Sequence, residues 1–239
     1  MKKLLSLSIA AAAIAAVADY QPIQVGVSEY TSAGLNTVIP APYTSLAGSE
    51  TIPVSELVKV ANLPAGTMLY YYNDSTFNAW IKGTGDNAGK WVGSDVQDKD
   101  GVSCSPGADT VVLGPGKALW LVLTESSTTQ KIYVYGKPVT TYSSTVDAGK
   151  TALIANPKSA NSTLSISGMA NGDVISVIGS EGLSTYTYST TKSQWGSMVK
   201  PASGKGLPQW TAFDSFSFPS GTGIWYTSKG SSSVTITWN

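Results

Sequence analysis

"GKALWLVL" at residues 116–123 and "GTGIWYTS" at residues 221–228 follow one pattern at an offset of 105 positions. In each stretch a glycine is followed by two residues of varied type, an aliphatic residue and a tryptophan. Glycine permits a tight turn because it has no Cβ, and a tryptophan at the start of a strand buries a large apolar surface. We therefore predict that both tryptophans are core anchors of a repeated β unit rather than platforms for a ligand. The predicted repeat anchors are Gly116, Trp120, Gly221 and Trp225.

Further matches occur in the same order along the two halves of the chain. Their offsets differ, as expected where the loops of an internal repeat diverge in length. We predict two related modules in tandem, residues 19–138 and 139–239, with a boundary at Lys137-Pro138, because the residue before a proline favours an extended conformation. The matched segments are "LPAGTML" (63–69) with "MANGDVI" (169–175), Trp91 with Trp195, "AGLNTVIP" (33–40) with "AGKTALIANP" (148–157), and "KIYVYG" (131–136) with "SVTITW" (233–238).

Local patterns within each module favour strands. "TMLYYYN" (67–73) and "VISVIGS" (174–180) are rich in β-branched and aromatic residues, and a glycine turn precedes each of them. "TYTYST", "KIYVYG" and "VTITW" alternate with period two, which is typical of a strand with one buried face. "GTGDNAGKW" (83–91) predicts a hairpin loop. The predicted fold class is all-β, with two related antiparallel β-sandwich or barrel-like modules in tandem.

One segment, "TIPVSELVKVA" at residues 51–61, has helical features. Thr51 could cap a helix, Pro53 suits an early helical position and Leu57 could face the core. The matching part of the second module, "SANSTLSISG" (159–168), has no such signal. We therefore expect at most a short helix near 52–60.

The first eighteen residues have the features of an export signal. Lys2 and Lys3 precede an apolar run, and Ala16-Val17-Ala18 supplies the small residues that a signal peptidase reads. That run is shorter than the roughly 20 residues that a membrane-spanning helix needs, so we expect no membrane span in the mature form. The predicted location is the periplasm, the cell surface or the extracellular space.

The charged residues argue against a nucleic-acid partner. Without the predicted signal, thirteen lysines face fifteen acidic residues, a net charge of −2, and the chain has no arginine or histidine. A nucleic-acid-binding surface normally has a basic patch in which arginine reads phosphate and guanine. Charged residues make up 13% of the chain, compared with about 25% in typical domains, which fits an extracellular or envelope protein.

The single cysteine, Cys104, excludes an intramolecular disulfide. A buried core must therefore hold the fold together, and a chain of this length can supply one. A free thiol in an exported protein can mark a crosslink between chains. The surrounding "GVSCSPGAD" (101–109) instead suggests a loop with a tolerated cysteine.

The absence of histidine removes most hydrolytic chemistry. Ser-His-Asp and Cys-His mechanisms and the usual histidine-containing zinc sites are excluded. "GTGDNAGKW" lacks the Gly-Lys-Ser/Thr ending of a phosphate-binding P-loop, and we expect no cofactor. A glycosidase needs only two carboxylates, so it stays open as an alternative. The glutamates considered for that role, none in a recognisable pair, are Glu29, Glu50, Glu56, Glu125 and Glu181.

"DVQDKDG" at residues 95–101 is the one cluster of acidic residues. Asp95, Asp98 and Asp100 could supply oxygen ligands to calcium, and Gly101 could allow the tight turn of a calcium loop. The spacing departs from the EF-hand series, and no glutamate follows at the required distance. We predict a solvated loop, with calcium binding as the alternative.

Aromatic side chains offer a second route to a ligand, because flat rings stack on the apolar faces of sugars. Tyr70, Tyr71 and Tyr72 are consecutive, so neighbouring side chains in a strand point to opposite faces. Packing in the core or between the modules is the alternative to such a platform. The candidate sugar-binding residues are Tyr71, Trp80, Trp91, Trp195 and Trp210.

The order of these features resembles modules in uncharacterised exported bacterial proteins. The shared features are an opening strand ending in proline, a glycine turn before a strand such as "GTMLYYYN", a tryptophan further on, a glycine-to-tryptophan stretch and a last strand. The resemblance covers most of the mature chain. It implies an extracellular or envelope-associated β module and no catalytic residues.

Together these observations predict a non-enzymatic structural protein of the envelope or extracellular space, such as a surface-layer or filament subunit. It would associate with itself or with other envelope proteins. The strands "VTITW" (234–238) and "YQPIQVGVSEY" (20–30) are expected to be exposed edges that pair with another chain. The alternatives are a carbohydrate-binding or adhesive module, which would bind glycans, and a glycosidase.

Overall fold

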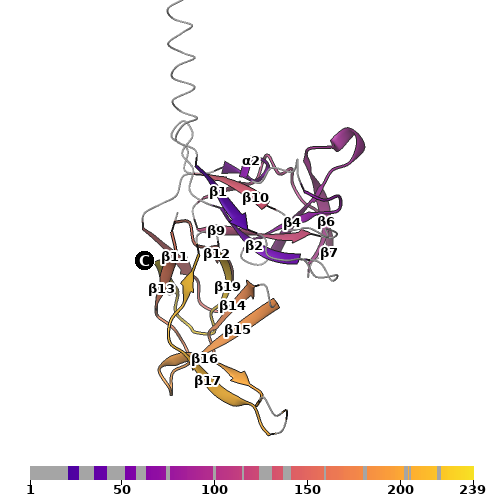
Figure 1. Cartoon of the computed structure of the whole chain (residues 1–239). Helices are drawn as coiled ribbons and strands as arrows, with labels where there is room; N and C mark the ends of the chain where they lie inside the picture. Colours follow the sequence, from indigo (N-terminus) through magenta and orange to yellow (C-terminus); the bar gives the residue numbers. More distant parts are fainter. Residues whose placement is uncertain are drawn as a thin grey trace, which may run out of the picture.

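The chain folds as an all-β protein in the computed structural model, which describes residues 21–26, 35–41, 52–57, 63–73, 76–98, 101–114, 116–123, 131–136, 141–158, 160–179, 182–201, 204, 206–219 and 222–239. Every pairing between the described strands is antiparallel (Figure 1). The elements of the first half are β1 (Gln21–Gly26), β2 (Leu35–Ala41), β3 (Ile52–Pro53), α2 (Val54–Leu57), β4 (Met68–Asn73), β5 (Thr76–Lys82), a 3₁₀ turn (Gly85–Asn87), β6 (Trp91–Asp98), β7 (Gly101–Cys104), β8 (Val112–Leu113), β9 (Lys117–Leu123) and β10 (Lys131–Gly136). Those of the second half are β11 (Tyr142–Val146), β12 (Thr151–Ala155), β13 (Ser162–Ser167), β14 (Val174–Gly179), β15 (Gly182–Ser189), β16 (Gln194–Val199), β17 (Gln209–Phe213), β18 (Ser217–Phe218), β19 (Gly223–Thr227) and β20 (Val234–Trp238).

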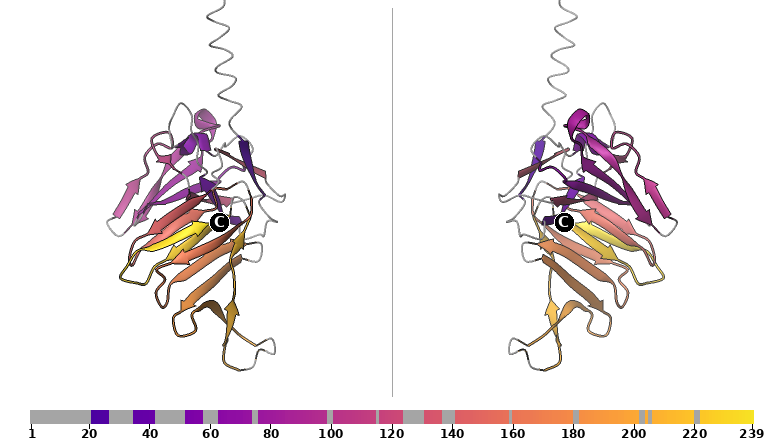
Figure 2. Two further views of the ribbon diagram at one scale, coloured as in Figure 1. Left: turned by 90° about the vertical axis from the view of Figure 1, so that its left-hand side faces the viewer. Right: turned by 90° about the vertical axis from the view of Figure 1, so that its right-hand side faces the viewer.

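A long sheet of twelve strands runs through both halves (Figure 2). Its order is β17-β16-β15-β14-β19-β12-β9-β4-β5-β6-β7, and β2 also pairs with β9. The halves join where Lys117 of β9 lies opposite Ile154 of β12, and the Ala155 N–H donates to the Gly116 carbonyl at 3.0 Å. The two halves therefore share one sheet, and their division into tandem modules stays a prediction.

The strand pairing of the first half recurs in the second with the strand numbers raised by ten. β4 pairs with β5 and β9 as β14 pairs with β15 and β19, while β2·β9, β3·β8 and β1·β10 correspond to β12·β19, β13·β18 and β11·β20. The registers also correspond: Trp120 lies opposite Tyr70 and Val38, and Trp225 lies opposite Ser176 and Leu153. These residue pairs have the same offsets as the matched sequence segments, so the pairing agrees with the predicted repeat.

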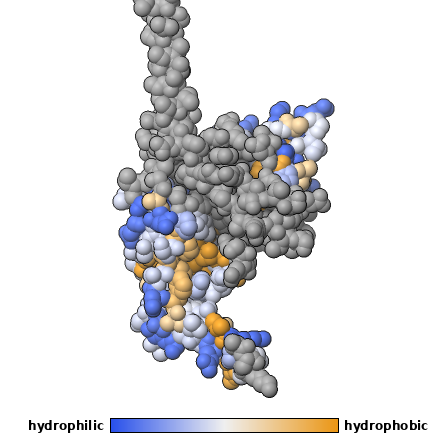
Figure 3. Space-filling model, viewed as in Figure 1, coloured by the Kyte–Doolittle hydropathy of each residue, from blue (hydrophilic) through white to orange (hydrophobic). Residues whose placement is uncertain are grey.

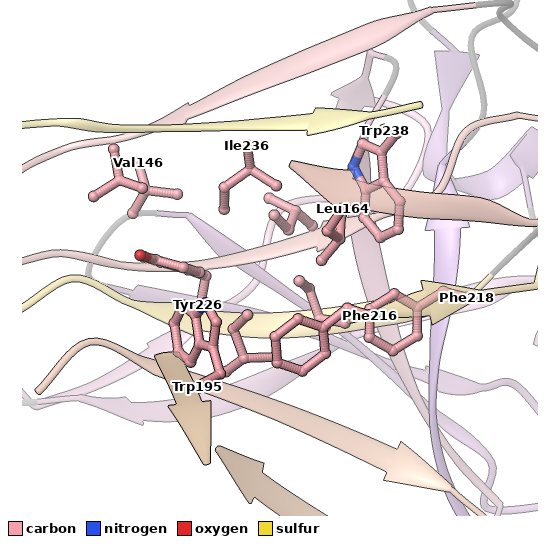
Figure 4. Packing of buried hydrophobic residues seen from close by; sticks show 12 residues of the cluster. Val146, Leu164, Trp195, Phe216, Phe218, Tyr226, Ile236 and Trp238 are labelled. Atoms are coloured by element: carbon pink, nitrogen blue, oxygen red, sulfur yellow. The ribbon is translucent and has the colours of Figure 1, made fainter. Parts of the chain in front are cut away.

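A large core lies in the second half, where a four-stranded sheet, β11-β20-β13-β18, packs on the long sheet as a β-sandwich. In β20 the buried residues Val234, Ile236 and Trp238 alternate with Thr235 and Thr237, as expected for a strand with one apolar face. Figure 4 shows side chains of both sheets converging between them. The buried cluster consists of Val146, Ile154, Leu164, Ile175, Trp195, Phe216, Phe218, Ile224, Tyr226, Val234, Ile236 and Trp238.

Two predictions about local structure need correction or narrowing. The strand "VTITW" was expected to be an exposed edge, but β20 lies between β11 and β13, because its three apolar residues fill the core. β1, from the other expected edge segment, pairs with β10. The helix expected near 52–60 is present as the single turn α2, and residues 58–60 lie outside the described part.

The predicted export signal, residues 1–18, lies outside the residues that the structure describes. Within the part that is described, the structure has no helix of the length and apolar character that a membrane span requires. Export and location therefore stay predictions from the sequence.

Replacing Ile236 by alanine should lower the free energy of unfolding by about 2–5 kcal/mol, because it removes a fully buried side chain between two sheets and leaves a cavity. Thr235→Ala, at the neighbouring exposed position, should cost no more than about 1 kcal/mol. Urea unfolding followed by tryptophan fluorescence measures both. Equal losses for the two variants would contradict the placement of the core.

Candidate interaction surface

Four of the five predicted sugar-binding aromatics are core residues. Trp80 is 0% exposed and Tyr71, Trp91 and Trp195 are 9%, 7% and 8% exposed. The Trp80 indole N–H donates to the Pro106 carbonyl at 2.7 Å. A buried ring has no open face for a sugar, so the structure does not assemble the predicted platform from these four residues.

Trp210, the fifth candidate, lies half-buried in β17, where it faces Met198 across the hairpin with β16. Its ring covers Gly196, where an added Cβ would lie 2.5 Å from the indole. Glycine at 196 therefore lets the ring pack closely against the backbone of β16. The structure does not bring Trp210 together with the other four candidates.

The two repeat tryptophans meet each other instead of anchoring separate cores. The rings of Trp120 and Trp225 are 6.0 Å apart and nearly perpendicular, at 88°. Tyr72 packs against Trp225 at 5.5 Å and Tyr70 against Trp120 at 5.6 Å. We call this half-buried group, together with Phe77 and the buried residues beneath it, the joint cluster. The buried residues are Ala118, Leu153 and Ala155.

Gly116 occupies the tight turn that the sequence predicts for it. Its φ is +72°, a conformation that side chains with a Cβ rarely adopt. An added Cβ would also lie 1.9 Å from the ring of Tyr142, at the start of β11. The turn before β9 therefore contacts the first strand of the second half. Gly221, its counterpart, lies outside the described residues.

A buried carboxylate, missed by the sequence reasoning, stabilises the second half. Asp173 is 0% exposed and accepts hydrogen bonds from the Tyr226 hydroxyl at 2.7 Å, the Lys229 N–H at 2.6 Å and the Ala170 N–H at 3.0 Å. Burial raises the pKa of Tyr226, and its hydrogen bond to Asp173 and the charge of that group raise it further. Because three donors occupy the carboxylate, its role is structural.

The equivalent turn in the first half is closed by a neutral side chain, Thr67, instead of a carboxylate. Thr67 is also 0% exposed and donates through its hydroxyl to the Pro64 carbonyl at 2.7 Å. In both turns the preceding glycine has positive φ, +76° and +87°. The register places Leu121 where the second half has Tyr226. Asp173 and Tyr226 thus occupy the positions that Thr67 and Leu121 have in the first half. The "AGT" and "NGD" turns reveal the difference between threonine and aspartate, but not its partner difference between leucine and tyrosine.

The acidic cluster lies largely in strands rather than in the predicted loop. Asp95 and Asp98 belong to β6, three positions apart, and positions an odd number apart belong to opposite faces of a strand. Asp100 lies outside the described residues, so calcium binding stays a prediction. Across the described ranges, no group of three or more His, Cys, Asp or Glu residues could hold a metal ion. Cys104 is also in a strand, β7, opposite Asp95, and not in the expected loop.

A small cavity of about 150 Å³ lies beside the junction of the halves, between β9, β11 and β12. Its lining combines apolar residues such as Ile154 with Lys117, Lys150, Ser144 and a single acid, Asp147. Two carboxylates across a cleft, as a glycosidase needs, are not present in this cavity. Four of the five candidate glutamates lie outside the described residues, and no side-chain placement is described for Glu56.

The outer face of the four-stranded sheet is uncharged and consists of hydroxyl side chains. Ser143 of β11 and Thr237 of β20 are opposite each other, with their oxygens 2.8 Å apart. Ser165 of β13 lies on the other side of Thr237, and its hydroxyl accepts from the Asn239 amide at 2.5 Å. This face therefore satisfies part of its hydrogen bonding within the sheet.

The β16–β17 hairpin projects from the body of the protein (Figures 1 and 2). Exposed apolar side chains gather on it: Met198, Val199 and Leu207 are 62%, 48% and 86% exposed (Figure 3). Among the described strands β17 pairs only with β16, so its outer edge is open. Two adjacent apolar residues, Met198 and Val199, could have signalled this, since adjacent side chains in a strand point to opposite faces.

Comparisons of the chain with protein-family models, curated proteins and solved structures found no match. Function therefore has to be inferred from the surfaces described above. Of these, the projecting hairpin combines exposed apolar side chains with unpaired backbone groups, and we take it as the candidate interaction surface.

Replacing Tyr226 by phenylalanine should cost about 1.5–3 kcal/mol of stability at neutral pH, because a buried carboxylate loses a donor. In the folded state the pKa of Tyr226 is raised above 10.0, the ordinary pKa of a tyrosine. The stability that its neutral hydroxyl contributes is therefore fully present below pH 10.0, and it is lost as the pH rises from there toward the raised pKa. The wild type should therefore lose stability more steeply than Tyr226→Phe between pH 9 and 12. Parallel curves of unfolding free energy against pH would contradict this role of the pair.

Proposed function

We propose that this chain is an exported, non-enzymatic structural subunit of the cell envelope or extracellular space, which associates through a sheet edge. The observation that carries the proposal is the open edge of β17 in a projecting hairpin with exposed apolar residues. An open edge presents a row of N–H and C=O groups with which a strand of another chain can pair.

The rest of the surface supports a structural role. Charged residues make up only 13% of the chain, and the outer face of the four-stranded sheet carries serine and threonine. The buried carboxylate Asp173 is fully engaged, and the chain has no histidine.

Protein lacking residues 1–18 should associate in a concentration-dependent manner. Light scattering on a dilution series measures the mass, and negative-stain imaging of the same fractions shows whether the assemblies are ordered. A monomer at every concentration would contradict the proposal. If ordered assemblies form without any contact at β17, the structural role stands and the interface lies elsewhere on the surface.

Carbohydrate binding is the second candidate, favoured by one observation. The Trp210 ring packs over Gly196 and is only half-buried, so part of the ring stays open to a sugar. If this function holds, a glycan array should give a signal that Trp210→Ala abolishes and that Met198→Ala, at the facing position, reduces less. No signal from the wild type on the array would remove this candidate.

A further inference from the structure

We infer that the β17 edge pairs with the β17 edge of a second copy of this chain, antiparallel about a twofold axis at Thr211. This inference rests on the proposed function and names the partner of the same surface. The pairing would join the long sheets of two copies into one. Three observations support this pairing: the charged residues near the two ends of the sheet, the register that the faces of β17 allow, and the opposite charges that flank the strand.

The two end strands of the long sheet, β17 and β7, are both uncharged but differ in the charged residues that flank them. β17 has five residues, "QWTAF", with no charge and no proline. At the other end, β7 has four residues and follows Asp98-Lys99-Asp100 in the sequence. Charges at an edge discourage pairing. Three charged residues directly precede β7, whereas the one charged residue directly next to β17 is Asp214, so β7 is the more protected end and β17 the more receptive one. A contact that uses β17 twice avoids the protected end and closes as a dimer.

The register follows from the faces of the strand. Gly196 and Met198 of β16 lie opposite Ala212 and Trp210, which therefore share one face of the sheet. Pairing centred on Thr211 places Trp210 of one copy opposite Ala212 of the other, so a large side chain meets a small one. It also pairs all five residues of the strand. Centring on Trp210 would oppose two indoles, and centring on Ala212 would bring Asp214 against Trp210.

Opposite charges flank the ladder in this register. The next row beyond the strand sets Asp214 of one copy opposite Pro208 of the other. Within one copy, Val199 lies opposite Gln209, so the same row continues to Lys200. Asp214 and Lys200 are both exposed in the single chain. The twofold axis repeats this complementary arrangement at both ends of the ladder, which favours a second copy as the partner.

The Trp210 side chain, the largest in β17, leaves the outer edge of this strand uncovered. The Trp210 ring is held over Gly196, toward β16 and away from the open side. Thr211 itself is exposed, so it tolerates substitution in the single chain. In the proposed dimer the two Thr211 side chains face each other across the axis.

This symmetry gives a direct experiment on protein lacking residues 1–18. Thr211→Lys and Thr211→Glu each place two like charges face to face, which should weaken self-association at least about tenfold in sedimentation velocity. An equimolar mixture of the two variants should recover the association, because lysine then faces glutamate. Thr185→Lys and Thr185→Glu, at an exposed position of β15 inside the sheet, are the matched controls and should associate as the wild type does.

The outcomes separate the inference from the proposed function. Loss in each variant with recovery on mixing supports the dimer, and recovery also shows that both variants are folded. Loss without recovery overturns the twofold register. Association unchanged by either Thr211 variant overturns the β17 contact but leaves a self-associating subunit. A wild type that stays monomeric overturns both.

Discussion

The contact between Trp120 and Trp225 is the interaction on which the arrangement of the whole sheet depends. The direct ladder between the halves is short, since it rests on the pairing of Lys117 with Ile154 and on one hydrogen bond from Ala155 to Gly116. Such a bond contributes about 0.5–1.5 kcal/mol. Burial of aromatic surface, at about 25 cal/mol per Å² and roughly 150–250 Å² for a fully buried ring, contributes more even when it is incomplete. The joint cluster therefore keeps the two halves of the sheet together, and the β16–β17 hairpin forms one end of that sheet.

The two halves use this shared framework differently. In the first, a neutral Thr67 closes the glycine turn above Leu121, whereas in the second Asp173 closes it and binds the Tyr226 hydroxyl. A carboxylate can remain in the core there because three donors surround it. Corresponding strands of the two halves thus keep the same backbone pairing, while the polar groups at corresponding positions differ together. The end strands of the long sheet also differ in their flanks: three charged residues precede β7, whereas a single charged residue, Asp214, directly follows β17.

The strands could be predicted from the sequence because the alternation of apolar and polar residues is a local property. Alternation in "VTITW" defines a buried face, and the matched segments around Trp120 and Trp225 carry the offsets that the registers reproduce. The neighbours of a strand are not local, so β20 was wrongly expected at an edge. For the same reason the sequence could not separate Trp80, which is in the core, from Trp210, which is half-exposed. The contact of Asp173 with Tyr226 spans 53 positions and has no sequence signature of its own.

The meeting of equivalent tryptophans at the joint has the geometry of an association between two like units. Two separate units would form such a contact only above a threshold concentration. Here the chain that follows β10 leads directly into β11, and this connection gives each half a high effective concentration of the other. The joint therefore forms at any dilution, and a modest, half-buried set of rings is sufficient to hold it.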